Sequence, residues 1–343
     1  MPSRWTHAIR VAGLAAALLA LPAIGRGQDV KIDSETFGGL QPRNIGSAAM
    51  SGRIAAMDAV EGDRLTLYVG AASGGVWKSV DGAVTFKPVF DKHCQSIGAI
   101  AIDRQDVRTV WVGTGESWVR NSVSLGDGIY KTTDGGDNWQ HLGLKDSERI
   151  ARIVIDPKRG DTVYVAVTGH LWNAHPERGV YRTRDGGKTW QRVLFVNDDT
   201  GCADIAMDPE DPNTLYAAMW QFRRQPWTFS SGGPGSGLYK STDGGDTWRR
   251  LSAGLPAGDL GRMAVSVSPA QSSRVYAFVE SKTSAMYRSD DKGESWIKLS
   301  TAAGVISRPF YFAYVVADPK DPDRRPRRRS RTAARSPRPR CSA

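Results

Sequence analysis

The chain has 343 residues, of which 40% are hydrophobic and 24% charged; this composition is typical of a globular protein and excludes the collagen-like and disulfide-rich classes. The formal net charge of +10 comes from the two ends, since residues 324–343 hold nine Arg, residues 1–27 hold three, and neither segment has an acidic residue. Residues 28–323 carry 34 basic and 36 acidic side chains. Because this central part is nearly neutral, it lacks the basic groove of a nucleic-acid-binding protein, and no nucleic-acid partner is expected.

Residues 1–27 are predicted to be a signal peptide. A basic start is followed by an apolar run over residues 11–24 and by the small residues Gly25 and Gly27. An uncleaved membrane anchor is the alternative, although the run is short for a bilayer-spanning helix. No later segment has the roughly 18 consecutive apolar residues that such a helix needs. We therefore expect an exported protein, periplasmic or extracellular, with no integral membrane segment once the signal is removed.

The three cysteines, Cys94, Cys202 and Cys341, are odd in number and none belongs to a CxxC motif. A Cys94–Cys202 disulfide would suit an exported protein, but the pattern favours unpaired thiols.

A short motif recurs five times along the chain. Its copies are SVDGAVTF (79–86), TTDGGDNW (132–139), TRDGGKTW (183–190), STDGGDTW (241–248) and SDDKGESW (289–296). The shared aspartates are Asp81, Asp134, Asp185, Asp243 and Asp291. They follow one another at intervals of 48 to 58 residues. Each copy follows three short runs of apolar, β-branched and aromatic residues, such as IVIDP (153–157), TVYVAV (162–167) and GVYR (179–182).

This repeat predicts an all-β fold, a β-propeller of four-stranded blades. Five blades fit within residues 28–323, and FAYVVADPKDPD (312–323) matches the first strand and turn of a sixth. The pattern then stops, so the propeller is expected to be incomplete, with exposed edges at residues 54–58 and 312–317. The Arg-rich tail 324–343 is predicted to be disordered; a frameshifted or truncated gene is favoured over a tail that binds nucleic acid or anionic lipid.

The repeated motif is expected to lock the turn between the third and fourth strands of each blade. Its aspartate can accept hydrogen bonds from the turn, and its glycines permit positive φ. The closing aromatic residues are expected to anchor one sheet on the next. They are Phe86, Trp139, Trp190, Trp248 and Trp296. Because one aspartate lies in each blade around the periphery, the set is not expected to form a calcium site, and no metal or cofactor is predicted.

The motif resembles the Asp-box, or BNR, repeat of sialidases, family 74 glycoside hydrolases, the photosystem II assembly factor and the Vps10 domain of sortilin. The segments IGSAAMSGRIAAMD (45–58), ASGGVWKS (72–79), ERIARIVIDP (148–157) and PWTFSSGGPGSGLYKSTDGG (226–245) are similar to exported bacterial proteins labelled sortilin N-terminal or BNR-like. The resemblance covers about residues 36–322. It implies a non-catalytic binding or assembly propeller for peptide or glycan ligands, with an Asp-box glycoside hydrolase as the alternative.

The family 74 enzymes place a catalytic aspartate just before the Gly-Gly pair of the first blade. The corresponding residues here, 68–75, read YVGAASGG and contain no carboxylate, which argues against the hydrolase.

Three long connections, 113–128, 167–179 and 220–237, are predicted to share the face opposite the Asp boxes, where loops on a rigid scaffold commonly bind ligands. The predicted binding residues there are Trp118, Arg120, Trp172, Arg178, Arg223 and Trp227. Glu116 and Glu177 are weak catalytic candidates, with ion pairs as the alternative role. The spacing of His170 and His175 is not that of a zinc site. The expected partner is an extended peptide or glycan; alternatively, the loops cover the axis or contact a downstream domain that this chain lacks.

Overall fold

The computed structural model describes residues 53–300, 309–312 and 314–323, all of which belong to one unit of the chain, Ser47–Ala343. The predicted signal peptide (1–27), the start of the predicted propeller (28–52) and the Arg-rich tail (324–343) lie outside these residues. Within the described part, no helix has the length and apolar character that crossing a membrane requires.

The described residues form five antiparallel sheets, each following chain order from first to last strand. The first sheet contains β1 (Ile54–Ala59), β2 (Leu67–Ala71), β3 (Val76–Ser79) and β4 (Lys87–Pro88). The second contains β5 (Ile97–Ile102), β6 (Val110–Thr114), β7 (Ile129–Thr132) and β8 (Gln140–His141). A short 3-10 helix, η1 (Lys145–Ser147), leads to the third sheet, with β9 (Ile150–Asp156), β10 (Arg159–Val167), β11 (Gly179–Thr183) and β12 (Gln191–Leu194).

The last two sheets repeat this plan. The fourth contains β13 (Thr200–Met207), β14 (Leu215–Gln225), β16 (Gly237–Ser241) and β17 (Arg249–Leu251), and an additional strand, β15 (Thr228–Ser231), pairs with the end of β14. The fifth contains β18 (Met263–Val267), β19 (Val275–Val279), β20 (Ala285–Ser289) and β21 (Ile297–Ser300). The predicted all-β architecture of four-stranded sheets is confirmed.

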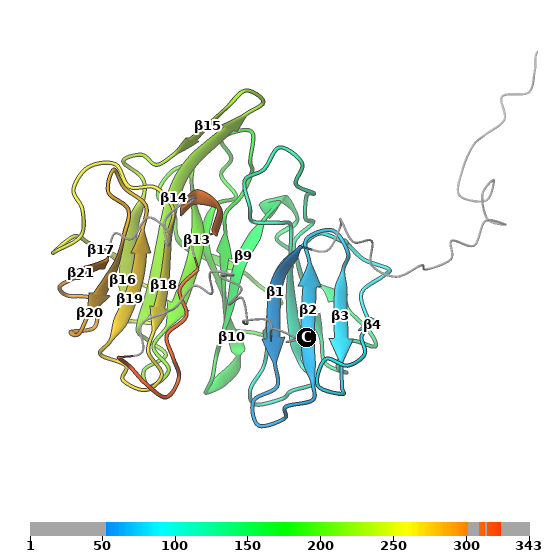
Figure 1. Ribbon diagram of the computed structural model, residues 1–343. Coiled ribbons are helices and arrows are strands. Elements are labelled where there is room, and N and C mark those ends of the chain that lie inside the picture. The colour runs from blue at the N-terminus through cyan, green and yellow to red at the C-terminus, as the bar shows by residue number, and fades with distance from the viewer. Residues whose placement is uncertain (1–52, 301–308, 313, 324–343) are drawn as a thin grey trace, which may run out of the picture. The chain divides into compact units, whose positions relative to one another are not determined.

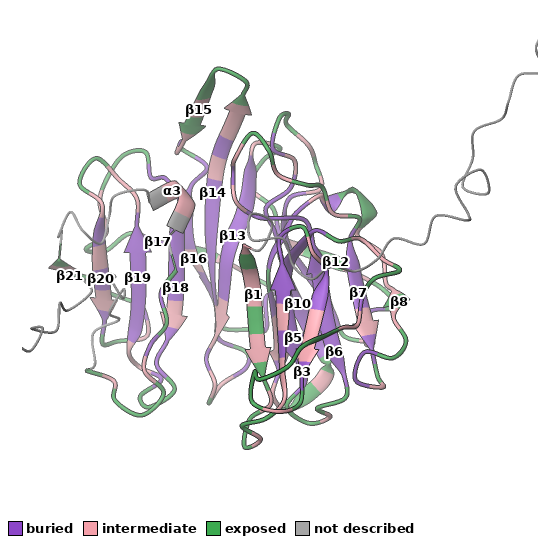
Figure 2. Cartoon of the chain, turned by 45° about the vertical axis from the view of Figure 1, so that its right-hand side comes forward, coloured by how far each residue is buried: buried purple, intermediate pink, exposed green. Residues whose placement is uncertain are grey.

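The hydrophobic core lies between neighbouring sheets. The first strands β1, β5, β9, β13 and β18 contact one another in order, as expected of propeller blades around an axis (Figure 1). Two of the second strands, β6 and β19, are buried along their whole length, whereas the outermost strand β21 is largely exposed (Figure 2). A strand covered on both faces gains from apolar residues at every position, which explains runs such as TVYVAV that do not alternate.

The two faces of the sheets carry the connections that the repeat predicts. In each Asp box a backbone N–H donates to a carbonyl in the turn between the first and second strands. Gly135 bonds to Arg108, Gly186 to Asp161 and Gly244 to Asn213, at 2.9 to 3.0 Å. The Asp boxes and the first turns therefore share one face.

Two segments differ from the prediction. Residues 220–237, expected to be a loop, contain the β14–β15 hairpin. Residues 312–317, expected to be a strand, include the end of the short helix α3 (Pro309–Phe312) and an extended stretch that pairs with no described strand. Val315 and Ala317 are buried there, whereas Tyr314 and Val316 are exposed. The segment thus has the alternation of a strand but lacks the second strand that would complete its hydrogen bonding.

Cys94 and Cys202 are both unpaired, as expected. Cys341 lies outside the described residues.

Candidate functional site

The Asp-box aspartates are fully engaged in their own turns. In the fourth sheet, Asp243 accepts hydrogen bonds from Ser241 Oγ at 2.7 Å and from the backbone N and Oγ1 of Thr247 at 2.9 and 2.6 Å. These bonds, that from the Thr247 hydroxyl foremost, lower the pKa of Asp243 to about 2. The other four aspartates have the same kind of bonds. The carboxylates therefore serve the turns and are not free to bind a ligand.

On the face opposite the Asp boxes, the three long connections are tied to one another. Arg224 on β14 donates through Nε to Asn121 Oδ1, a residue 103 positions earlier, and Asn121 Nδ2 donates to Pro226 O at 3.3 Å. The backbone N–H of Arg224 donates to Leu171 O at 3.1 Å. Residues 113–128, residues 167–179 and the β14–β15 hairpin therefore form one surface, which we call the loop platform.

A separate apolar cluster supports the loop platform. Val119, Leu171, Ala203, Trp220 and Phe222 are buried together. Since the first two come from the loops of the second and third sheets, the loops are packed down on the scaffold instead of projecting from it. A surface held in this way loses little conformational entropy when it binds a ligand.

Two of the predicted binding residues are largely occupied by contacts within the protein. Arg178 is completely buried and donates to Thr168 O, His170 O and Asn173 O at 3.1, 2.5 and 3.1 Å. Burial lowers the pKa of its guanidinium to about 10. Trp118 stacks on Tyr311, with ring centroids 6.2 Å apart and ring planes at 28°. In this geometry Arg178 holds residues 167–179 in place, and Trp118 offers at most one face to a ligand.

Of the other four predicted binding residues, the two tryptophans are exposed and the two arginines are partly buried. Trp227, at the tip of the β14–β15 hairpin, is 80% exposed, and Trp172 is 40% exposed. Arg120 donates to Ser122 Oγ at 3.3 Å, and Arg223 pairs with Asp199. Exposed indoles can stack on a chain ligand, and guanidinium groups can bond to its polar groups, so the loop platform carries side chains of both kinds.

The two carboxylates considered for catalysis have different surroundings. Glu116 is buried and forms a bidentate ion pair with Arg53, with Nε–Oε1 and Nη2–Oε2 distances of 2.9 and 2.7 Å. Glu177 accepts a hydrogen bond from Tyr181 Oη at 2.7 Å. Burial and this bond raise the pKa of Tyr181. Among the described residues, neither a hydrogen bond nor an ion pair joins the two carboxylates, which belong to different sheets.

The two histidines lie against each other. The rings of His170 and His175 are stacked, with centroids 3.6 Å apart and planes at 7°. His170 Nε2 lies 2.9 Å from Asp146 O. Within residues 53–300, 309–312 and 314–323, no cluster of three or more His, Cys, Asp or Glu side chains is arranged to hold a metal ion.

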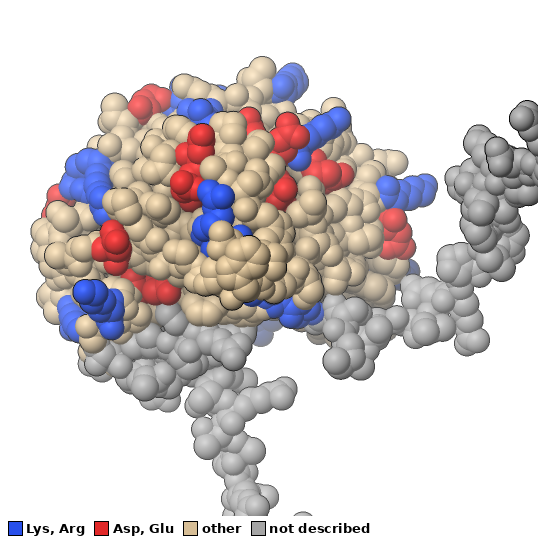
Figure 3. Space-filling model, turned by 90° about the horizontal axis from the view of Figure 1, so that it is seen from above, with Lys and Arg blue, Asp and Glu red and all other residues tan. Residues whose placement is uncertain are grey.

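Charges of both signs are interspersed on the loop platform's side of the protein. Figure 3 looks down on this side, and basic and acidic side chains alternate across it. A ligand that binds there would meet local polar contacts and not a field of one sign.

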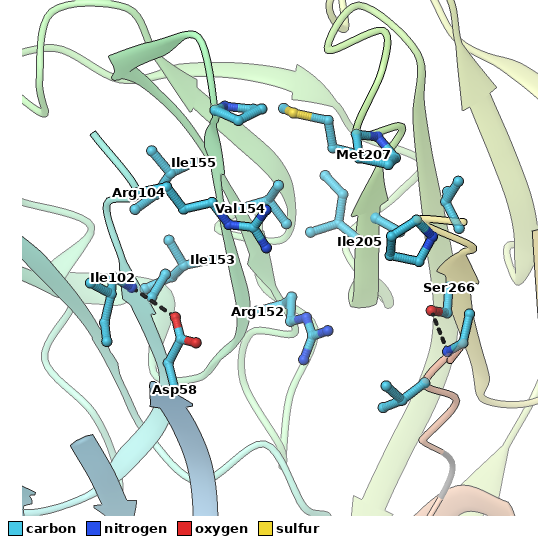
Figure 4. A pocket seen from close by; sticks show the side chains of 18 of the residues that line it. Asp58, Ile102, Arg104, Arg152, Ile153, Val154, Ile155, Ile205, Met207 and Ser266 are labelled. Carbon is cyan, nitrogen blue, oxygen red and sulfur yellow. Dashed lines mark hydrogen bonds between the residues drawn. The ribbon is translucent and has the colours of Figure 1, made fainter. Parts of the chain in front are cut away.

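A second candidate site lies at the axis. A cavity of about 470 Å³ is lined by the first strands of all five sheets and by the prolines Pro157, Pro209 and Pro269 of the first turns. Its charged residues are Asp58, Glu61, Arg104 and Arg152. Figure 4 labels Asp58, Arg104 and Arg152. Asp58 Oδ2 accepts a hydrogen bond from Ile102 N at 2.9 Å, and burial raises the pKa of this carboxyl. The sequence analysis predicted the first strands, such as IVIDP (153–157), but not the cavity between them, because consecutive first strands are more than forty positions apart and their arrangement around the axis leaves no local pattern.

Comparisons with known proteins agree with the fold. Residues 127–255 match the family described as Sortilin-Vps10 (sortilin, neurotensin receptor 3). A xyloglucanase of Paenibacillus sp. is 25% identical over 234 residues, which cover 55% of this chain and 20% of the relative. The photosystem II assembly lipoprotein Ycf48 of Picosynechococcus sp. is 30% identical over 149 residues, covering 36% of this chain and 43% of the relative.

A solved structure is also similar. An ancestral GH74 enzyme superposes with a TM-score of 0.59 at 20% identity, covering 79% of this chain and 34% of that one. At this identity the likeness shows the fold alone. The resemblance expected from the sequence is thus confirmed as similarity to the Sortilin-Vps10 family and to GH74-type propellers. The chain spans about a fifth of the first curated relative's length and a third of this solved structure.

Proposed function

We propose that this protein is an exported, non-catalytic propeller that binds an extended peptide or glycan chain on its loop platform and acts as a binding or assembly module. The main observation behind the proposal is that hydrogen bonds join the three loops to one another. Asn121, Leu171 and Arg224 join three different sheets through hydrogen bonds. They leave Trp172 and Trp227 exposed on the resulting surface.

The relatives support an assembly role and a glycan ligand, although the xyloglucanase is an enzyme and so also favours the hydrolase alternative. One is an assembly lipoprotein and another a xyloglucanase, so similar propellers serve assembly and act on a polysaccharide. Export rests on the pattern of residues 1–27, which lie outside the described part.

Glycoside hydrolysis is less well supported. It requires one carboxyl to donate a proton while a second acts as nucleophile or base across a cleft. Both oxygens of Glu116 already accept hydrogen bonds from Arg53. Because both carboxylate oxygens are bound by one guanidinium, Glu116 is engaged within the protein and is a poor candidate for either role.

Glycan and peptide arrays probed with the wild-type chain, Trp172→Ala and Trp227→Ala test the proposal. Each substitution should weaken binding of the selected ligand by about 1–3 kcal/mol, or roughly 5- to 150-fold, with little change in melting temperature. Phe86→Ala, at an aromatic residue 39% exposed on the Asp-box face, is the matched control and should bind normally. Unchanged array profiles for both tryptophan variants would refute the proposal, and release of sugars from a bound glycan would favour the hydrolase. Trp118 is less suitable for this test, because its stacking on Tyr311 would mix folding with binding.

A further inference from the structure

Neighbouring sheets are joined by a contact that repeats along the chain. In every sheet an aromatic residue of the second strand lies directly opposite a basic residue of the third strand. The pairs are Tyr68 and Lys78, Trp111 and Lys131, Tyr164 and Arg182, Tyr216 and Lys240, and Tyr276 and Arg288. In the first four sheets this pair reaches the Asp box of the next sheet.

The contact with the next Asp box is specific. Tyr68 Oη and Lys78 Nζ both donate to Gly135 O, at 2.9 and 2.8 Å. Tyr164 Oη and Arg182 Nη1 both donate to Gly244 O, at 2.7 and 2.5 Å.

Two further sheets make the same contact in a modified form. Lys131 Nζ lies 3.5 Å from Gly186 O. In the fourth sheet, Tyr216 donates to Lys292 O and Lys240 to Glu294, at 2.8 Å each. In these four sheets, the partner of the aromatic and basic pair is therefore the box turn of the following sheet.

In the fifth sheet the pair has no box turn to bind among the described residues. Tyr276 Oη donates instead to Pro322 O at 2.5 Å, and Arg288 Nη2 pairs with Asp290 at 2.9 Å within its own sheet. Arg288 Nε is buried and has no hydrogen-bond partner. The equivalent side chain of the third sheet, Arg182, donates to Gly244 O in the next box turn. Arg288 has no such acceptor among the described residues.

The start of a further sheet is already in position there. The backbone N–H of Ala317 donates to Ser266 Oγ at 3.1 Å, just as Ile102 N donates to Asp58 between the first and second sheets. Val315 and Ala317 pack into the apolar cluster of Ala264, Tyr276 and Phe278.

The turn that follows has the same local structure as the equivalent turn of the fourth sheet. Asp318 Oδ1 accepts from Lys320 N at 2.9 Å and from Asp321 N at 3.2 Å. The corresponding bonds to Asp208 Oδ1 measure 2.9 and 3.3 Å. Residues 314–323 therefore take the place of a first strand and its turn, and their strand edge pairs with no described strand.

We propose that the outer side of the fifth sheet is an open inter-sheet interface, and that its occupant is strands two to four of a further Asp-box unit. The second strand of that unit would pair with residues 315–317, and its box turn would accept the Arg288 guanidinium. The first sheet of a second copy does not fit, because it has its own first strand, β1, which would compete with residues 315–317 for one position.

An insertion into the full chain tests this interface. A second copy of residues 274–300, which hold strands two to four of the fifth sheet, is placed between Asp323 and Arg324, so that it follows the seated turn in register. The copy should raise the melting temperature by about 5 °C or more in a single transition, since it adds one interface of the existing kind. A scrambled insert of the same composition should not.

The Arg288→Ala substitution then tests whether the gain in melting temperature depends on the contact between Arg288 and the added box turn. It should lower the melting temperature of the extended chain clearly more than that of the unextended one. Arg182→Ala, whose box partner is already present, should lower both equally. A similar fall in melting temperature on Arg288→Ala in the extended and the unextended chain would overturn the proposal. Limited trypsin digestion gives a second check, and an insert that is removed as readily as the scrambled one would also overturn it.

Two further outcomes also decide the matter. If the first insert yields insoluble protein, a copy of residues 109–142 from the second sheet replaces it, and insolubility of both overturns the proposal. Concentration-dependent self-association of the unextended chain, abolished by Arg288→Ala, would identify a second copy as the occupant and likewise overturn it.

Discussion

Replacement of Asp204 offers a sharp test of how the sheets are held together near the axis. This residue lies in β13 and is buried. Its Oδ2 accepts a hydrogen bond at 3.1 Å from Val265 N in the next sheet, and its Oδ1 accepts one at 3.0 Å from Ile205 N. Arg152 Nε lies 3.6 Å from Oδ1. Since first strands of neighbouring sheets do not pair with each other, a side chain that bonds across the gap replaces a missing ladder bond.

The expected loss in free energy of unfolding depends on which buried groups each substitution leaves without a hydrogen-bond partner. Asp204→Ala removes the acceptor of a buried N–H from another sheet, which costs about 1–3 kcal/mol, and opens a small cavity besides. We expect a total loss of about 2–4 kcal/mol in the free energy of unfolding. Asp204→Asn keeps an amide oxygen for Val265 N–H and no longer buries a negative charge, so the loss should be below about 1.5 kcal/mol.

The pH dependence gives an independent check. Burial raises the pKa of Asp204 above its ordinary value, despite the nearby Arg152 and the two backbone hydrogen bonds. The folded state therefore holds this proton more tightly than the unfolded state, and the stability contributed by the residue falls as pH rises from about 4 through the folded pKa. Asp204→Asn should lack this fall, so its stability relative to the wild type should improve as pH rises.

Urea unfolding followed by tryptophan fluorescence at several pH values between 4 and 8 measures both effects. Equal losses for the Ala and Asn variants would refute the argument that the acceptor oxygen matters. A difference between Asn variant and wild type that stays constant with pH would refute the argument from burial of charge.

Three other changes are predicted from the repeat and the loops. Trp248→Ala should lower the free energy of unfolding by roughly 2–4 kcal/mol and Asp243→Ala should also destabilise, both without changing affinity for a platform ligand; calorimetry and the binding assay together check this. The Asp-box carboxylates have lowered pKa values, so their contribution to stability should persist above pH 4 and disappear as pH falls to about 2. A midpoint of urea unfolding that stays unchanged between pH 5 and 2.5 would contradict this prediction. Gly115→Ala should destabilise by more than about 2 kcal/mol, since φ is +89° and a β-carbon would lie 1.8 Å from Glu148 O; an unchanged melting temperature would contradict this.

Local chemistry explains why the sheets could be predicted from the sequence. The side chain of Asp185 bonds to residues two and four positions away, Thr183 and Thr189. A turn built from contacts this short leaves the same sequence pattern wherever it occurs. Its recurrence every 48 to 58 residues then predicts the number and order of the sheets.

The loop platform could be predicted only in outline, because its geometry depends on contacts between distant residues. The repeat assigns the three long connections to one face, but the Asn121–Arg224 bond spans 103 positions and the Arg53–Glu116 pair spans 63. No local pattern distinguishes the buried Arg178 from the accessible Arg120. The β14–β15 hairpin was likewise expected to be a loop, since its short second strand lies outside the repeat.

The division of the protein into two unlike faces follows from the contacts between sheets. On the Asp-box face, the aromatic and basic pair of each sheet needs the box carbonyl of the next at hydrogen-bond distance, as Tyr164 and Arg182 do with Gly244. An insertion there would separate the partners and break an inter-sheet contact. On the other face, buried residues such as Gly115 and Arg178 hold the loops in place, but exposed positions such as Trp172 and Trp227 can change without disturbing the sheets. The exposed positions of the loop platform, such as Trp172 and Trp227, are therefore where a scaffold shared by proteins of different activities can acquire its own ligand.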